Sequence, residues 1–343
     1  MSPDVQTKSL LFIVGAGASK EFGQSMPVGS ELKLLIEQQL DAEFGEIPEA
    51  NGPIKSALMQ SPAGLSPRDE EAAYRIRDGL FAQDSIDNLL NEWRDIPEMI
   101  RLGKVAIASA ILAAERESTL GSTRGNNPND IYRAMTNLNN CWLKYVLTAL
   151  SPGTHRRKID DIFSDVAFVT FNYDRCIEQY LYWAFQKASG TSAQDAAHIL
   201  ASIPIVHVYG DLGRLPFQNG VAPVVSFGSK ASIKPHIYER IKTYTEEDHD
   251  EQNLANVHAL VRNAKRIIFL GLGYHERNME LLFAAGPPRP DAVIWGTSLN
   301  PDQTRLLAVQ ESLRDPMRKR GARLESSACA PFLRNFWSAI HEN

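Results

Sequence analysis

The sequence predicts an α/β protein, a Rossmann-like and mostly parallel sheet with helices on both faces and a large helical insertion. Short apolar runs, each ending at a glycine or a small polar residue, read as buried strands. Helical patterns separate most of these runs, and residues 45–160 show no strand pattern at all. Strands that alternate with helices are typical of an open sheet, in which ligands bind beyond the carboxyl ends of the strands.

Composition and charge narrow the class of protein. The chain has 343 residues, 43% of them hydrophobic and 22% charged, with a net charge of −5, so we expect no direct nucleic-acid binding. Its three cysteines, Cys141, Cys176 and Cys329, are too far apart for a zinc site and favour a reducing cytoplasm. Without a signal peptide or an apolar stretch of about 20 residues, the chain is expected to be cytoplasmic, without metal or membrane contact.

The first strand is predicted at residues 10–14, where five apolar residues lead directly into Gly15-Ala-Gly-Ala-Ser19. Gly15 can adopt a turn that is closed to other residues, and Gly17 lets the backbone approach a ligand closely. A strand, a glycine turn and a helix start together suit a pyrophosphate. A full dinucleotide fingerprint needs a third glycine, however, and Lys20 stands there. By itself, the turn fits a structural role as well as a phosphate site.

The next part of the chain is predicted to be helical. A helix is expected to begin near Ser30, and residues 45–68, rich in proline and glycine, are expected to be irregular. Residues 69–150 carry apolar side chains at helical spacing. Asp87, just behind a predicted helix cap, either lines a cleft or belongs to a surface helix. We interpret residues 45–160 as an insertion into one domain that spans residues 1–343.

The strand pattern then returns, and polar residues follow several of the strands. Further strands are predicted at residues 165–171, 203–209, 224–227, 266–270 and 292–295. Helices are predicted at residues 175–187, 231–263, 301–313 and 330–341. Polar or glycine-containing clusters at strand ends are Thr170-Phe-Asn-Tyr-Asp174, His207-Val-Tyr-Gly210 and Gly271-Leu-Gly-Tyr274. In a parallel sheet these clusters converge with the first glycine turn at one edge.

Together the clusters resemble the sirtuin superfamily, and more closely its bacterial sirtuin-like branch, which contains NAD-cleaving anti-phage defence proteins. Sirtuins carry Gly-Ala-Gly-x-Ser at the first turn and Thr-Gln-Asn-x-Asp after a second strand. Residues 15–19 match the first motif, and residues 170–174 match Thr, Asn and Asp of the second at the same spacing. The resemblance covers residues 9–30 and 165–300. It assigns NAD binding to Gly15, Ala16, Gly17, Ser19, Thr170, Asp174, Gly271 and Gly273.

Two features depart from the sirtuin pattern. The paired cysteines of the sirtuin zinc ribbon are missing, which argues against peptide deacylation. The catalytic histidine of sirtuins directly precedes a glycine, whereas here Tyr209 does so and His207 lies two residues earlier. Residues i and i+2 share a face of a strand, so His207 and Tyr209 are predicted to point the same way. Asn172 and His207 are the candidate catalytic residues, with Tyr209 as the alternative to His207.

The resemblance implies a NAD glycohydrolase that takes NAD as its substrate and needs no zinc. Asn172 offers a donor and an acceptor for a ribose hydroxyl and an attacking water, and His207 can accept a proton near neutral pH. Helix caps at Asn172 and Asp174 and a core histidine at His207 are the structural alternatives. A protein deacylase and a non-catalytic NAD or ADP-ribose sensor remain as alternative functions.

The resemblance also implies a biological role and partners. NAD depletion during phage defence is the expected role, and proteins of this kind commonly act as homo-oligomers or with a partner protein. Since no effector domain is fused to this chain, a separate activator is expected, such as a DNA-translocating ATPase or an Argonaute-type protein.

Overall fold

The computed structural model describes residues 8–151, 159–231, 233–243, 251–299 and 322–341. At its centre is one sheet of six parallel strands in the order β3-β2-β1-β4-β5-β6. The strands are β1 (Leu10–Val14), β2 (Val166–Thr170), β3 (Ile205–His207), β4 (Arg266–Leu270), β5 (Val293–Thr297) and β6 (Arg323–Glu325). This order is that of a Rossmann-type sheet, so the predicted fold class is confirmed. Chain order reverses at β1, which places the glycine turn at the switch point of the sheet.

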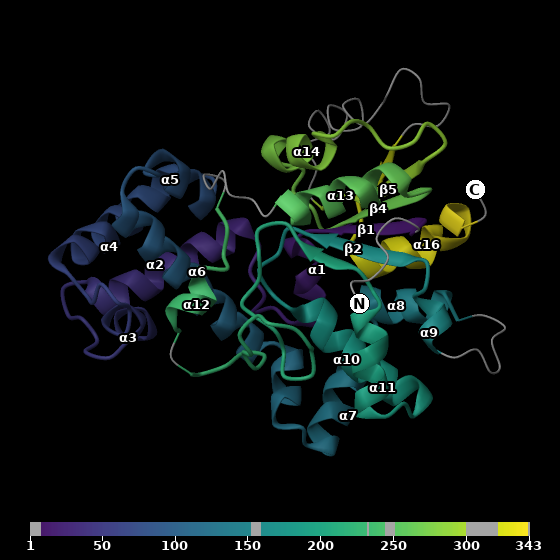
Figure 1. The fold of residues 1–343 in the computed structure, drawn as a ribbon, viewed down its shortest axis with the longest axis horizontal. Coiled ribbons are helices and arrows are strands. Elements are labelled where there is room, and N and C mark those ends of the chain that lie inside the picture. Colours follow the sequence, from purple (N-terminus) through teal and green to yellow (C-terminus); the bar gives the residue numbers. More distant parts are fainter. Residues whose placement is uncertain (1–7, 152–158, 232, 244–250, 300–321, 342–343) are drawn as a thin grey trace.

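Helices cover both faces of the sheet because its central strands are apolar on both sides. Leu11 and Ile13 of β1 lie in one hydrophobic core, whereas Leu10, Phe12 and Val14 lie in the other. Figure 1 shows α13 and α14 on the first side and α8, α10 and α16 on the second. These helices are α8 (Trp142–Ala149), α10 (Cys176–Ser189), α13 (Glu251–Asn263), α14 (Glu276–Phe283) and α16 (Cys329–His341).

The described residues between β1 and β2 form helices and loops without a strand, as predicted. The helices are α1 (Ala16–Ser19), η1 (Lys20–Phe22), α2 (Gly29–Phe44), α3 (Pro53–Met59), α4 (Pro67–Gly79), η2 (Leu80–Ala82), α5 (Ile86–Glu92), α6 (Pro97–Glu117), η3 (Thr119–Gly125), α7 (Pro128–Asn137), α8 and α9 (Ile159–Ile162). In Figure 1, α2 to α6 gather at one end of the molecule. Trp142 of α8 instead packs beneath the sheet, its ring 6.1 Å from that of Phe12. The second half of the segment is therefore part of the layer that covers the sheet.

Local predictions differ from the structure at three places. Residues 45–68 are not wholly irregular, because α3 begins at Pro53, in the first helical turn where proline is favoured. Val224 forms only an isolated bridge with Arg214, so the strand predicted at 224–227 is absent. The short edge strand β6, three residues long, was not predicted.

The last third of the chain is otherwise close to expectation. The helix predicted at residues 231–263 is seen as α12 (Pro235–Tyr238) and α13, and α11 (Ala193–Ala201) precedes β3. The helix predicted at residues 330–341 is α16, and the one at 301–313 lies outside the described residues.

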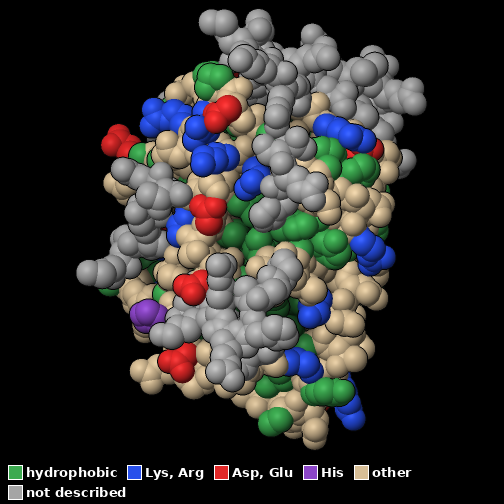
Figure 2. Space-filling view, turned by 90° about the vertical axis from the view of Figure 1, so that its right-hand side faces the viewer, with side chains coloured by type: hydrophobic (Ala, Val, Ile, Leu, Met, Phe, Trp, Pro, Cys, Tyr) green, Lys and Arg blue, Asp and Glu red, His purple; other side chains and the backbone are tan. Residues whose placement is uncertain are grey.

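The surface gives no further indication of environment. No helix in the described part of the chain is long and apolar enough to cross a bilayer. On the face that contains α16, hydrophobic side chains lie near the middle, with charged side chains around them (Figure 2). Apolar surface of this kind is common in proteins and assigns no function by itself.

Candidate functional site

The glycine turn after β1 packs directly against the turn after β4. The amide of Gly15 donates to the carbonyl of Leu270 at 2.9 Å, and the amide of Gly17 donates to the carbonyl of Gly271 at 3.0 Å. A Cβ on Gly15 would lie 2.6 Å from the Gly271 carbonyl oxygen, and Gly271 itself has a φ of +62°. Close contact between two backbones therefore requires these glycines, with or without a ligand.

This packing bears on the predicted pyrophosphate cradle. The amides of Gly15 and Gly17 already donate to β4 and its turn, and the amide of Ala18 donates to the Gly15 carbonyl at 3.0 Å. Ala16 begins the four-residue helix α1, and Gly273 lies exposed in the loop after β4. Phosphate binding by this turn stays a prediction, carried by the resemblance.

Behind the turn, three polar residues from the predicted motifs form one hydrogen-bonded group. The side-chain amide of Asn172 donates to the Ser19 hydroxyl at 2.9 Å, and that hydroxyl donates to Asp174 Oδ2 at 2.9 Å. All three side chains are buried. The backbone N–H of Asn172 donates to the hydroxyl of Thr170, at the end of β2, at 3.1 Å. The structure therefore brings together the polar residues of the first two motifs.

Asp174 also has a structural role, as the alternative prediction proposed. Its Oδ1 accepts the amide of Cys176 at 3.1 Å, at the first residue of α10. Burial raises the pKa of Asp174, although its hydrogen bonds with Cys176 and Ser19 lower it in part. One carboxylate thus joins the start of α10 to the Ser19–Asn172 pair.

His207, at the end of β3, is held by hydrogen bonds at both ring nitrogens. Nδ1 lies 2.9 Å from the Asn172 carbonyl oxygen, and Nε2 lies 2.9 Å from Glu178 Oε1. Burial alone would lower the pKa of His207, but the Glu178 carboxylate outweighs burial and raises it to about 9. A doubly protonated ring satisfies both acceptors and has no lone pair left. This arrangement favours a positioning role, whereas the sequence predicts a proton acceptor.

Tyr209 does not share a face with His207, so that prediction is wrong. Regular strand β3 ends at His207, and the chain turns at the next two residues. Tyr209 packs against Phe171 in the core on the other side of the sheet, with ring centroids 5.6 Å apart. Its hydroxyl donates to Asn278 Oδ1 at 2.6 Å. The rule that residues i and i+2 point the same way fails here because the strand has ended.

Three charged residues next to the site were missed by the sequence analysis. Glu178 holds His207, and its second oxygen, Oε2, is buried without a hydrogen-bond partner among the described residues. Arg175 forms a fully buried ion pair with Glu115 of α6, with 2.5 Å between Nη2 and Oε2. Glu178 could have been noticed as an acidic residue next to the apolar face of a predicted helix. Nothing in the sequence indicates that Arg175 pairs with Glu115, because the two residues are 60 positions apart.

The helical insertion reaches the site through Asp87. The hydroxyl of Tyr173, the residue after Asn172, donates to Asp87 Oδ1 at 2.9 Å. Burial raises the pKa of Asp87 to about 6. Ser85, not Asp87, caps α5, since its side chain accepts the amide of Asn88. Asp87 thus contacts the loop after β2 through Tyr173, and it is not among the residues that line the cavity beside His207.

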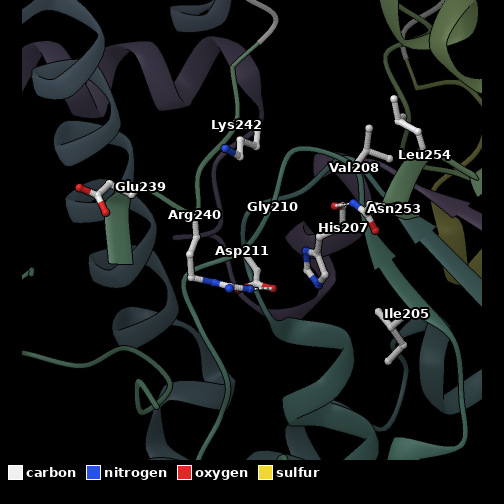
Figure 3. Close-up of a pocket in the computed structure, with 10 residues that line it drawn as sticks. All are labelled: Ile205, His207, Val208, Gly210, Asp211, Glu239, Arg240, Lys242, Asn253 and Leu254. Carbon is white, nitrogen blue, oxygen red and sulfur yellow. Dashed lines mark hydrogen bonds and ion pairs between the residues drawn. The ribbon is translucent and has the colours of Figure 1, made fainter. Parts of the chain in front are cut away.

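A cavity of about 390 Å³ opens beside His207, at the carboxyl end of β3 (Figure 3). Arg240 binds Asp211 through two hydrogen bonds of 2.9 Å each. Burial alone would raise the pKa of Asp211, but the positive charges of His207 and Arg240 hold it below its usual range. Glu239 points away from His207 in Figure 3, whereas the Lys242 and Arg240 side chains lie at the cavity. The polar side chains that line this cavity suit an anionic or strongly polar ligand.

Comparison with models of protein families gave no match, and comparison with curated proteins gave none either. The described residues contain no cluster of three His, Cys, Asp or Glu side chains that could hold a metal ion. Cys141, Cys176 and Cys329 are each buried as free thiols. The resemblance to sirtuins therefore rests on the sequence motifs alone.

Proposed function

We propose that this protein hydrolyses NAD at the bond between nicotinamide and ribose. Water adds a hydroxyl group to the ribose carbon, so that the products are nicotinamide, ADP-ribose and a proton. One observation carries the proposal: Ser19, Asn172 and Asp174 form a single buried hydrogen-bonded group at the carboxyl ends of β1 and β2. Ligands of open α/β sheets bind at that edge, and the same residues carry the sirtuin resemblance.

Hydrolysis of NAD needs few catalytic contributions from the protein, and the hydrogen-bonded group of Ser19, Asn172 and Asp174 can supply them. Nicotinamide leaves as a neutral molecule and needs no proton, while the transition state resembles an oxocarbenium ion. The site must hold the ribose, exclude bulk water and position one water molecule. The Asn172 amide can turn from Ser19 towards a ribose hydroxyl and that water, since it carries both donors and an acceptor. Ser19 then keeps its hydrogen bond to Asp174.

The neighbouring charged residues have supporting roles in this proposal. His207 binds the Asn172 carbonyl through Nδ1 and so positions the loop that carries the Asn172 side chain. Asp87 contacts the loop that carries Asn172 through the hydroxyl of Tyr173, so it can hold that loop in position.

The proposed role is depletion of NAD during phage defence, with activation by a partner protein. The partner would be of the DNA-translocating ATPase or Argonaute type, and the active form a homo-oligomer. Affinity purification from the native host, followed by size-exclusion chromatography, tests this proposal. A monomer without any co-purifying neighbouring gene product would argue against it.

The enzymatic proposal is tested by product analysis. Purified protein, alone and with any co-purifying partner, is incubated with NAD, and the products are separated by chromatography. We expect nicotinamide and ADP-ribose in equal amounts. A parallel reaction with an acetyl-lysine peptide tests the deacylase alternative, because O-acetyl-ADP-ribose as product would overturn hydrolysis.

A non-catalytic NAD or ADP-ribose sensor is the second candidate. The observation that favours it is His207, whose two ring nitrogens are both bound within the protein. Calorimetric titration distinguishes the two functions. A sensor binds NAD and leaves it intact with every partner tested, whereas the proposed enzyme releases nicotinamide.

A further inference from the structure

A second cavity, of about 250 Å³, lies between η3, α10 and the segment of residues 216–227. It shares no lining residue with the cavity beside His207. The residues that line it are Arg124, Asn126, Gln179, Tyr182, Trp183, Pro216, Phe217, Ser226 and Phe227. None of these residues belongs to the motifs that carry the proposed function, so this cavity has no assigned role.

One wall of this cavity is aromatic. The rings of Tyr182 and Phe217 are stacked, with centroids 3.7 Å apart and planes only 6° apart. Trp183 packs edge-on against Tyr182 at 4.8 Å. Tyr182 and Trp183 are both more than nine-tenths buried, so neither ring is free to rotate in solvent. A fixed aromatic wall favours a ligand with a planar ring system.

The rest of the lining is polar and carries one positive charge. Arg124 uses one of its five N–H donors on the Gly228 carbonyl, at 3.3 Å. The indole N–H of Trp183 is buried and has no hydrogen-bond partner among the described residues. A buried donor without a partner is costly, so a ligand acceptor that reached it after a small shift of the ring would be favoured. No Asp or Glu side chain lines the cavity to neutralise Arg124.

We propose that this cavity binds a nucleoside monophosphate, with the base against the aromatic wall and the phosphate on Arg124. The guanidinium group matches a phosphate with paired N–H donors. Asn126 supplies an amide for polar groups of the base or sugar, and Gln179, whose Nε2 donates to Thr123 Oγ1 at 2.7 Å, supplies its amide oxygen. The volume lies just below the range of about 300–1,000 Å³ that is typical of ligand pockets. It suits a mononucleotide and is small for a dinucleotide such as NAD. This proposal does not depend on NAD hydrolysis.

Calorimetric titration of the full chain with AMP tests the proposal, with adenosine and inorganic phosphate in parallel. AMP is expected to bind at one site, and each of the two parts is expected to bind at least about tenfold more weakly, because each lacks one set of contacts. Absence of AMP binding, or binding of phosphate as tight as that of AMP, would overturn the proposal.

Matched variants locate the site. Arg124→Gln is expected to weaken AMP binding about tenfold and to leave adenosine binding unchanged. Arg133→Gln, at a 77% exposed side chain outside this cavity, is the control and should bind AMP normally. Ser19→Ala, in the proposed NAD site, should also bind AMP normally. Equal binding by the Arg124 and Arg133 variants, or loss of binding in Ser19→Ala, would place AMP elsewhere and refute the assignment.

Discussion

Glu178 determines the charge state of His207. In Glu178→Gln the largest influence that raises the pKa of His207 is lost, while the burial that lowers it remains. We expect the pKa of His207 to fall well below 9, with only Asp211 and the Asn172 carbonyl left to oppose burial. Titration of the imidazole carbon-bound protons by NMR measures this directly. Glu280→Gln, at an exposed position of α14, is the control, and an unchanged pKa in Glu178→Gln would contradict the assigned ion pair.

For single residues, the sequence predicted the positions of the motif residues better than it predicted which side chains they contact. Ser19, Asn172 and Asp174 follow strands that are apolar on both faces, and parallel strands bring such positions to one edge. The partner of His207 could not be predicted, because it depends on how α10 packs against β3. Tyr209 was placed wrongly because the exact end of a short strand is not encoded in its apolar pattern.

Among the elements, α10 links several parts of the site. Asp174 caps its start, Arg175 binds Glu115 of α6, and Glu178 binds His207. Gln179 and Trp183 of the same helix face the second cavity. Helix α10 therefore lines the second cavity directly and is joined to the first one only through the contact between Glu178 and His207.

The contact between the two glycine turns makes Gly271 sensitive to substitution. In Gly271→Ala the new Cβ would lie 2.1 Å from the Ala18 amide nitrogen, at a φ of +62°. We expect a loss of about 3 kcal/mol or more in the free energy of unfolding, measured by urea denaturation. Gly64→Ala is the matched control, since its φ is +65° and a Cβ there meets nothing within 4 Å. Equal losses in the two variants would mean that backbone strain, without the contact, explains the effect.

The ion pair between α6 and α10 is the second element-scale test. Glu115→Gln leaves the Arg175 guanidinium buried without its carboxylate partner. The glutamine side chain offers one acceptor oxygen, where the carboxylate offered one to Nε and another to Nη2. We expect this variant to lose about 3–5 kcal/mol of unfolding free energy. Glu98→Gln, also on α6, removes a partly exposed pair with Arg68 and should cost at most about 1 kcal/mol. Similar costs would show that the buried pair is not needed to join α6 to α10.

Helices and strands with a strong apolar pattern were predicted correctly from the sequence, and those with a weak pattern were not. The five-residue strands β1, β2 and β4 were recognised because they are apolar and buried on both faces. The edge strand β6 was missed because three residues with exposed ends carry little pattern. The order of strands could not be predicted, since the apolar runs identify strands without identifying their neighbours.

For the whole molecule, the His207 ion pair makes stability depend on pH. The folded-state pKa of about 9 lies above the ordinary value of 6.5, so the contribution is fully present below pH 6.5 and is lost as the pH rises through 9. The full difference corresponds to about 3 kcal/mol. Urea denaturation at pH 6.5 and 9.5 should show this extra loss in the wild type and not in His207→Gln. Parallel pH profiles of the two proteins would contradict it.

Residues 45–160 belong to two different parts of the molecule, and only the whole structure shows this. The helical patterns of residues 69–150 look alike in the sequence, but α4 to α6 pack in one hydrophobic core with α2 and α3, whereas α8 packs against the other face of the sheet. Helical periodicity indicates an apolar face without indicating what covers it.

The central claim is that Asn172 carries NAD hydrolysis, and nicotinamide release by three proteins tests it most directly. Wild type, Asn172→Ala and the control Asn140→Ala, at an exposed position, are compared at saturating NAD, with any co-purifying partner present. We predict normal release by wild type and Asn140→Ala, and a loss of about 100-fold or more in Asn172→Ala with its fold intact by circular dichroism. Release by Asn172→Ala at the wild-type rate would contradict the assignment.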